Sequence, residues 1–467
     1  MFLKKSLIFL LGIFLATAGL GCKGLSSGEQ AAIKPMTLNY WRVYDGVDTF
    51  SEIINAYRAL HPNITINYRV LRPEEFQSEL LNALAEDRGP DMFTIQNNWM
   101  RAYQSKIYPL PKQTKVAYQT TEGAYQKTVV VKTQITITPT GKNIKDRYVE
   151  TVADNVLFTG LDPATNQSRE MIYGLPLSVD TLALYYNKDL LDQAGVAEAP
   201  KTWEDFQKAT KKLTKINPDN TILRSGAALG TGKNVLRSVD ILSLLMMQNG
   251  TRMTNDAGYP TFHLIPPGSN LPLPPGEQAL QFYTDFAQPT KEVYTWNATK
   301  PESLDAFVRG QTAFFFGYAY HLPFIRARAP KLNFSIVPVP QVNPQLPVNF
   351  ANFWVETVSK KTTHPDEAWD FILFASNAKN VVNYLNKVKK PTALRELITS
   401  ETEDADIGAF ASELLTAKSW YKGKDADLAE KYFLEMIDAV FLPDALTSPD
   451  VYNKAINTAA AKMGQTM

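Results

Sequence analysis

Hydrophobic positions between residues 36 and 95 follow two alternating periods. Apolar residues recur at helical spacing in residues 50–60 and 76–84, and they alternate with polar residues from 64 to 70. Short β-prone runs at 37–41 and 91–95 complete the pattern. The order strand, helix, strand, helix, strand within 60 residues predicts a mostly parallel sheet that is covered by helices.

Two later segments depart from this rhythm. Residues 128–138 are rich in Val, Ile and Thr and are followed by Pro139-Thr140-Gly141, which predicts an inserted hairpin or strand pair within residues 113–172. Residues 260–276 contain six prolines and are predicted to form an irregular loop.

The N-terminus has the features of an export signal. Lys4 and Lys5 precede an apolar stretch from Ser6 to Gly21, which is shorter than the roughly 20 residues that a membrane-spanning helix needs. The stretch ends in Gly19-Leu20-Gly21-Cys22, which resembles a bacterial lipobox. We therefore predict a signal peptide at 1–21, a lipid on Cys22, and a lipid-anchored linker at 22–35 that holds the exported protein on the outer face of the cell membrane or in the periplasm.

Composition excludes several functional classes. The 48 Lys and Arg residues balance the 47 Asp and Glu residues, so the charge gives no footprint for a nucleic-acid partner. A single cysteine cannot form an intrachain disulfide. The four histidines are scattered, so we expect neither a metal site nor another cofactor.

Five runs of sequence, taken in order, resemble a known family. They are similar to the family 1 extracellular solute-binding proteins of ABC importers, the maltose and multiple-sugar type. The runs are Tyr173-Gly174-Leu175-Pro176-Leu177-Ser178-Val179-Asp180 with Leu184-Tyr185-Tyr186-Asn187-Lys188-Asp189-Leu190, Pro200-Lys201-Thr202-Trp203-Glu204-Asp205-Phe206, Phe307-Val308-Arg309-Gly310-Gln311, Val337-Pro338-Val339-Pro340, and His364-Pro365-Asp366-Glu367-Ala368-Trp369.

The resemblance implies a fold and a mechanism. The expected fold is α/β and two-lobed, of the type II periplasmic-binding-protein kind, with a ligand cleft between two mostly parallel sheets. The chain would cross between the lobes near residues 179 and 349, which gives lobe 1 as 36–178 plus 350–398 and lobe 2 as 179–349 plus 399–467. The lobes of such a monomer close on a mono- or oligosaccharide and present it to permease subunits.

Candidate ligand residues follow from sugar chemistry and from this resemblance. Flat aromatic rings cover the faces of a pyranose, and carboxylates and amides bind its hydroxyls. The predicted contacts combine these types: Asp45, Asn98 and Trp99 after strands of lobe 1, Asp180 and Trp354 near the crossings, and Tyr318 or Tyr320 and Trp420 in lobe 2. Further candidates of lower rank are Trp41, Asn234, Asn352 and Arg237.

Several motif residues are expected to serve the fold alone. Thr202 with Asp205 is a helix-capping pair, and Thr363 with Asp366 has the same spacing. Trp203 and Trp369, in the first turns of the two helices, are predicted to lie in the core.

Other functions stay open at this point. The same fold could bind a polyamine or a glycerol phosphate, because Asp45, Asp180 and Trp420 also suit a cation. A secreted carbohydrate-active enzyme would need two carboxylates flanking a glycosidic bond, and Asp45 and Asp180 are the only such pair that we identify. A surface adhesion module is a third reading.

Overall fold

The computed structural model describes residues 33–123, 127–443 and 448–467. Its first sheet has the strand order β15-β3-β1-β2. Strands β1 and β2 pair in parallel, as do β1 and β3, whereas β15 runs antiparallel to β3. The strands are β1 (Met36–Val43), β2 (Ile64–Leu71), β3 (Met92–Gln96) and β15 (Trp354–Val358), and they confirm the predicted parallel arrangement.

Helices cover this sheet with the apolar faces that the sequence pattern predicts. Phe50, Ile53 and Tyr57 are buried on α2, and Phe76 and Leu80 are buried on α3. These spacings of three and four residues place the apolar side chains on one face of each helix. The helices beside the first sheet are α2 (Val47–Leu60), α3 (Pro73–Ala85), α4 (Met100–Tyr103), α13 (Pro365–Ala375) and α14 (Ala378–Val388).

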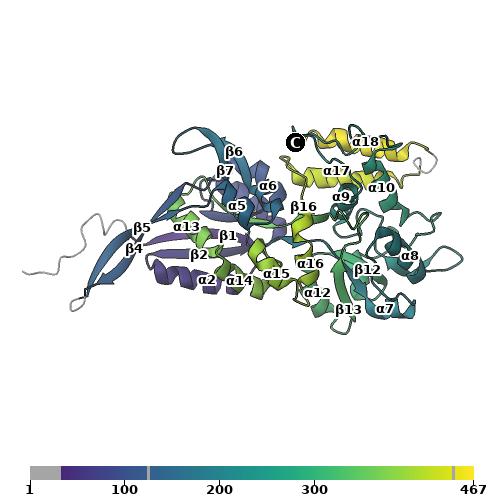
Figure 1. Ribbon diagram of the computed structural model, residues 1–467, viewed down its shortest axis with the longest axis horizontal. Coiled ribbons are helices and arrows are strands. Elements are labelled where there is room, and N and C mark those ends of the chain that lie inside the picture. Colours follow the sequence, from purple (N-terminus) through teal and green to yellow (C-terminus); the bar gives the residue numbers. More distant parts are fainter. Residues whose placement is uncertain (1–32, 124–126, 444–447) are drawn as a thin grey trace, which may run out of the picture.

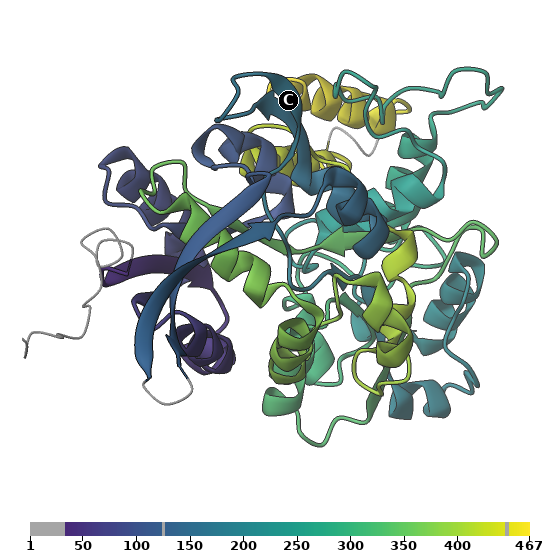
Figure 2. The ribbon, with the colours of Figure 1, turned by 60° about the vertical axis from the view of Figure 1, so that its left-hand side comes forward.

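The insertion consists of two hairpins rather than one. Residues 128–137 form a strand that pairs with residues 113–122, which confirms the predicted strand pair, and Thr140 caps the next helix. A second hairpin follows two short helices whose apolar side chains join the first core, while β4–β5 projects as a long ribbon (Figures 1 and 2). The elements are β4 (Gln113–Glu122), β5 (Thr128–Ile137), α5 (Gly141–Arg147), α6 (Glu150–Val156), β6 (Leu157–Leu161) and β7 (Ser168–Ile172).

The second sheet has five strands in the order β10-β11-β12-β9-β13. Its strands are β9 (Ala183–Asn187), β10 (Lys215–Ile216), β11 (Ile222–Ala227), β12 (Thr312–Gly317) and β13 (Phe334–Pro338). Helices flank it: α7 (Lys188–Gln193), α8 (Trp203–Leu213), α9 (Ser238–Gln248), α10 (Pro275–Asp285), α11 (Ser303–Val308), α12 (His321–Arg328), α17 (Ala426–Ala439) and α18 (Val451–Met463). The proline-rich segment before α10 is irregular, as predicted.

A small sheet lies where the chain passes between the two larger ones. Its order is β16-β14-β8, built from β8 (Asp180–Thr181), β14 (Asn349–Asn352) and β16 (Ala417–Lys418), with α15 (Ile398–Glu401) and α16 (Gly408–Ser412) nearby. One hydrophobic core contains Val179, and a second core begins at Leu182. In Figure 1 the elements of the two cores lie side by side, with β16 between them. The exact lobe boundaries stay a prediction.

Most of the residues assigned to the fold alone lie as expected. Trp203 and Trp369 are buried in the two cores, and the Thr202 hydroxyl accepts a hydrogen bond from the Asp205 N–H at 3.1 Å. The pairing of Thr363 with Asp366 is wrong, because His364 occupies the N-cap of α13 and the Asp366 carboxylate instead accepts the Lys115 N–H of β4 at 3.1 Å.

The predicted signal peptide, Cys22 and most of the linker lie outside the described residues. Within the part of the chain that the structure describes, no helix has the length and hydrophobicity needed to cross a membrane. The same part contains no cluster of three or more His, Cys, Asp or Glu side chains arranged to hold a metal ion.

Candidate functional site

A pocket lies between the two sheets and is lined from both sides. The carboxyl end of β3 contributes amide side chains, and β14 contributes the segment that passes between the cores. Helices α9 and α17 and residues 419–421 close the pocket from the second core. Its lining residues are Gln96, Asn97, Asn98, Arg237, Val239, Asp240, Ser243, Phe350, Ala351, Asn352, Ser419, Trp420, Tyr421, Ala426, Ala429, Glu430 and Phe433.

The pocket is narrow in this structure. Its volume is about 70 Å³, well below the roughly 300 Å³ at which pockets for drug-sized ligands begin. A pyranose can enter only if the two sides move apart, and we interpret the structure as a contracted form of the site. Two of the predicted contacts, Asn98 and Trp420, and two of the lower-ranked candidates, Asn352 and Arg237, line this one pocket.

The amide groups of β3 differ in what they bind. Asn97 is buried, and its Oδ1 accepts the Phe353 N–H at 3.4 Å, so it joins β3 to the passing chain. The Oδ1 atom of Asn98 is buried and has no hydrogen-bond partner among the described residues. A buried amide oxygen without a partner costs free energy, which a ligand hydroxyl would recover. This arrangement supports the prediction for Asn98.

Trp420 presents an aromatic ring to the pocket from the second core. The ring is half-buried and packs 5.5 Å from Phe433 of α17. Its indole N–H donates to the Ser243 hydroxyl of α9 at 3.0 Å. These contacts fix the plane of the ring, so Trp420 presents a rigid aromatic surface to the pocket.

Arg237 brings positive charge to the same pocket. Its Nε lies 2.7 Å from Oδ2 of Asp240, and the Tyr318 hydroxyl donates to the same carboxylate at 2.6 Å. Arg237 has a φ of 60° and precedes α9. This pairing neutralises the charge of Asp240, and Glu430 is the other acidic residue among those that line the pocket.

Tyr318 and Tyr320 have different surroundings. The Tyr318 side chain is 0% exposed, its hydroxyl is bound to Asp240, and it belongs to the second core. Tyr320 stacks on Tyr318 at 5.6 Å and retains partial exposure. Of the two alternatives that the sequence left open, the geometry favours Tyr320 as a surface for a ligand.

Trp99 and Trp354 form an aromatic cluster in the first core. Trp99 is buried and stacks on Tyr103 at 6.1 Å, and Trp354 meets it edge-on at 5.8 Å. Trp354 is the more exposed of the pair. Neither residue lines the pocket, so their predicted roles as contacts remain untested. Trp41 is buried beneath the Arg69 guanidinium, as its lower rank implied.

Asp45 lies within a buried network of charges. Its Oδ2 binds Arg42 at 3.0 Å and the Tyr384 hydroxyl at 2.9 Å, and its Oδ1 binds Lys390 at 3.0 Å. Burial alone would raise the pKa of Asp45, but Arg42 and Lys390 outweigh it and hold the pKa below its usual value. Both carboxylate oxygens already have charged partners, so a ligand hydroxyl would have to share them.

Asp180 holds the passing chain to the second core. Its Oδ1 accepts the Ala319 N–H at 3.0 Å, and its Oδ2 accepts the Tyr320 N–H at 3.4 Å. Burial raises the pKa of Asp180 to about 7, and these N–H groups together with Lys390 only partly oppose the shift. Asp180 does not line the pocket, but it fixes the backbone of Tyr320.

This pKa predicts that the protein loses stability as the pH rises. The folded state keeps the Asp180 carboxyl protonated up to about pH 7, whereas the unfolded chain ionises it near its ordinary value of 3.8. The stabilisation is therefore complete below about pH 4 and is lost as the pH rises to about 7. We expect Asp180→Asn to reduce this loss, which melting temperatures measured from about pH 4 to pH 8 would show. Parallel profiles for both proteins would contradict the assignment.

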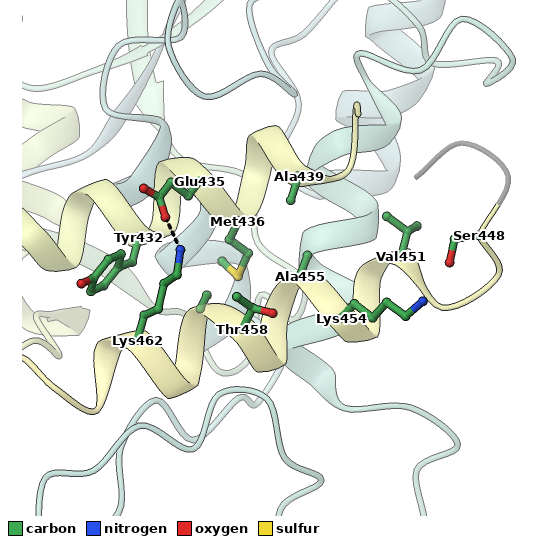
Figure 3. Close-up of a pocket in the computed structure, with 11 residues that line it drawn as sticks. Tyr432, Glu435, Met436, Ala439, Ser448, Val451, Lys454, Ala455, Thr458 and Lys462 are labelled. Carbon is green, nitrogen blue, oxygen red and sulfur yellow. Dashed lines mark hydrogen bonds and ion pairs between the residues drawn. The ribbon is translucent and has the colours of Figure 1, made fainter. Parts of the chain in front are cut away.

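A second, larger pocket lies away from all of these residues. It has a volume of about 340 Å³ and lies between α17 and α18. Figure 3 shows Met436 and Ala455 facing each other across it, with the ion pair of Lys462 and Glu435 at 2.7 Å beside them. All of its lining residues lie within 432–462, so the second core alone forms this pocket. The narrower pocket between the sheets therefore remains the candidate site.

Comparison with known proteins decides the family. The sequence profile described as bacterial extracellular solute-binding protein matches residues 45–382, well over half of the chain. The chain belongs to the bacterial extracellular solute-binding protein family.

Relatives of this solute-binding protein share its fold at low sequence identity. A binding protein of Brucella abortus (strain 2308) is 22% identical over 328 residues, which are 69% of this chain and 67% of that protein. An ABC transporter solute-binding protein of Thermotoga lettingae TMO, bound with α-D-tagatose, has a TM-score of 0.64 at 17% identity and covers 92% of this chain and 99% of its own. A cyclo/maltodextrin-binding protein complexed with maltotetraose has a TM-score of 0.69 at 14% identity, with 93% and 98% covered.

These findings confirm the predicted family and the predicted two-lobed α/β fold. They also confirm that the chain is an extracellular solute-binding protein, whose partner is a small-molecule ligand. A relative in Pyrococcus horikoshii, named as an extracellular-binding protein of an ABC transporter, is 22% identical over 236 residues, which are 48% of this chain and 47% of that protein. Membership of an extracellular family implies export. The individual ligand contacts come from the geometry described above.

Proposed function

We propose that this solute-binding protein captures a carbohydrate between its two lobes and delivers it to the permease of an ABC importer. The observation that carries the proposal is the pocket between the sheets, which combines the unpartnered amide oxygen of Asn98 with the fixed ring of Trp420. Amides bind sugar hydroxyls, and indole rings cover the C–H face of a pyranose. The maltotetraose and tagatose complexes of proteins with the same fold support this choice.

Closure of two lobes is the mechanism that we propose. Lobe 1 would consist of residues 36–178 plus 350–398, and lobe 2 of 179–349 plus 399–467. Asn98 lies on the first side of the pocket and Trp420 on the second, so a sugar that touches both stabilises the closed state over the open one. The permease then receives a closed, loaded protein.

We also propose that Cys22 carries a lipid, which the intact mass of protein extracted from membranes would show.

Charge at the pocket favours a neutral sugar over a polyamine. Polyamine capture needs several unpaired carboxylates. Of the two acidic residues that line the pocket, Asp240 is already bound to Arg237 and Tyr318, which leaves Glu430 alone. We further propose that the bound sugar is not hydrolysed. Both oxygens of Asp45 are occupied by Arg42, Lys390 and Tyr384, and such a carboxylate is poorly placed to act as a nucleophile or base.

A ligand screen by thermal unfolding tests the proposed function. Residues 23–467 would be heated with maltose, maltotetraose, mannobiose, α-D-tagatose, spermidine or glycerol 3-phosphate. A ligand at a hundred times its dissociation constant stabilises the native state by about 2.7 kcal/mol. We expect a rise in melting temperature with at least one saccharide and an unchanged saccharide after prolonged incubation. A rise with spermidine or glycerol 3-phosphate alone would overturn the sugar assignment.

A further inference from the structure

Tyr44 is an exposed aromatic residue held in an unfavourable backbone conformation at the end of β1. Its φ is 68°, and its side chain is 62% exposed. The N–H of Asp45 donates to the carbonyl oxygen of Val43 at 2.8 Å, so Tyr44 is the central residue of a three-residue turn. A positive φ at the centre of such a turn is the rare, strained form, and tyrosine has no side-chain group that compensates for it.

The surrounding side chains enforce this conformation. The Tyr68 hydroxyl donates to the Asp45 carbonyl oxygen at 2.8 Å. Arg42, Tyr384 and Lys390 bind the Asp45 carboxylate from three directions. Strained residues persist only where neighbouring structure fixes them, and they concentrate at ligand clamps and active sites. The network therefore determines where the Tyr44 ring lies.

The ring of Tyr44 lies at the edge of the space between the two cores. It meets Trp354 edge-on at 6.0 Å, and Trp354 follows Asn352 of the pocket by two residues. Burial raises the pKa of the Tyr44 hydroxyl, and the charges that act on it come from Glu74, from Arg237 of the second core, and from Lys390. Tyr44 also contributes to raising the pKa of Tyr320, the partly exposed tyrosine of the second core. Charges from both cores thus act on the Tyr44 hydroxyl, and Trp354 contacts its ring.

We propose that Tyr44 is a ligand-binding residue, presented to a saccharide by the strained turn, and that Asp45 is the positioning residue that holds the turn. This inference rests on the proposed function and changes the role predicted for Asp45. The Asp45 carboxylate is already bound by Arg42, Lys390 and Tyr384, whereas the ring of the neighbouring Tyr44 is free to cover the C–H face of a sugar. Trp354 supports that ring from its edge.

Stability and binding should respond in opposite directions when Tyr44 is replaced by glycine. Glycine adopts a positive φ without strain, so Tyr44→Gly is expected to keep or raise the melting temperature. The same change removes the aromatic surface, and we expect affinity to fall at least about tenfold. Tyr44→Phe keeps the ring and should stay within about threefold of the wild type. Asp45→Asn should lower the melting temperature as well as affinity, because it weakens the network that holds the turn.

Titration calorimetry on residues 23–467 tests the inference with maltose, maltotetraose, mannobiose and α-D-tagatose. Tyr259→Ala is the matched control, since Tyr259 is 59% exposed and lies in a loop of the second core. Wild-type affinity for Tyr44→Gly, with any saccharide that the wild type binds, would overturn this inference alone. A fall in the melting temperature of Tyr44→Gly with unchanged affinity would assign Tyr44 a structural role. Absence of wild-type binding to all four saccharides would overturn the proposed function and this inference with it.

Discussion

Replacing Arg42 with methionine is expected to lower the free energy of unfolding by about 3–5 kcal/mol, the usual cost of breaking a buried ion pair. Arg42 is buried, and its Nη2 atom lies 3.0 Å from both Asp45 and Glu356. Its guanidinium also lies over the Phe50 ring at 4.4 Å. Without Arg42, Lys390 still neutralises Asp45, but Glu356 loses its cation.

Glu356 explains the expected size of this effect. Burial raises its pKa, and Arg42 and the Tyr40 hydroxyl that donates to it are the main groups that oppose the shift. The double variant Arg42→Met/Glu356→Gln removes both charges of this pair. We expect it to recover at least about 1 kcal/mol relative to Arg42→Met alone, a coupling typical of residues in one network.

Urea unfolding of the wild type and the variants measures these differences. The control is Arg88→Ala, which removes a side chain that is 60% exposed and paired with the equally exposed Glu86. Such a surface change is expected to stay within about 0.5 kcal/mol. An Arg42→Met variant as stable as Arg88→Ala would show that the network does not stabilise the fold, and no recovery in the double variant would show that Glu356 is not the group left uncompensated.

Replacing Trp420 with alanine is expected to have the largest effect on ligand binding. Trp420 lines the pocket, and its ring is held in one plane by Ser243 and Phe433. Loss of a tryptophan that anchors a ligand typically costs about 2 kcal/mol or more, which is roughly thirtyfold in affinity. Trp420→Phe keeps a smaller aromatic ring but lacks the indole N–H, so we expect its affinity to lie between those of the wild type and Trp420→Ala.

Stability has to be separated from affinity in this experiment. The Trp420 ring also packs against Phe262 at 6.3 Å, so its removal destabilises the second core to some extent. Phe282→Ala is a matched control, because Phe282 is a half-buried aromatic residue of that core, packs on Trp203 and lies outside the pocket. Calorimetric titration well below both melting temperatures should show weakened binding for Trp420→Ala alone. Equal affinities of the two variants would remove Trp420 from the site.

Local sequence periodicity was sufficient to predict three strands of the first sheet and the two helices between them. The apolar spacing of α2 and the alternation of β2 arise from neighbours along the chain, and a strand–helix–strand unit has few ways to pack. The capping pair of Thr202 and Asp205 is local as well, and it was predicted correctly. The same spacing led us to predict a capping pair of Thr363 and Asp366. That prediction was wrong, because a strand 251 residues away supplies the hydrogen-bond partner of Asp366.

Site residues were predicted unevenly for a related reason. Asn98 and Trp420 could be named because the carboxyl end of a parallel strand and a known family position direct attention to them. The sequence gives no sign that Asp45 is bound by Lys390 or Arg237 by Asp240. Tyr44 was missed because its backbone conformation cannot be predicted from the sequence. The signal that could have found it is an aromatic residue directly before the candidate Asp45.

The sequence by itself determined the order of strands and helices in residues 36–95, the family, and the class of extracellular solute-binding protein. The tertiary structure alone decided which side chains bind one another and which remain available to a ligand. Tyr318 and Tyr320 differ by two positions, yet one is bound to Asp240 within the core and the other remains partly exposed. Burial and pairing depend on groups that are distant in sequence, whereas periodicity reports only neighbours along the chain.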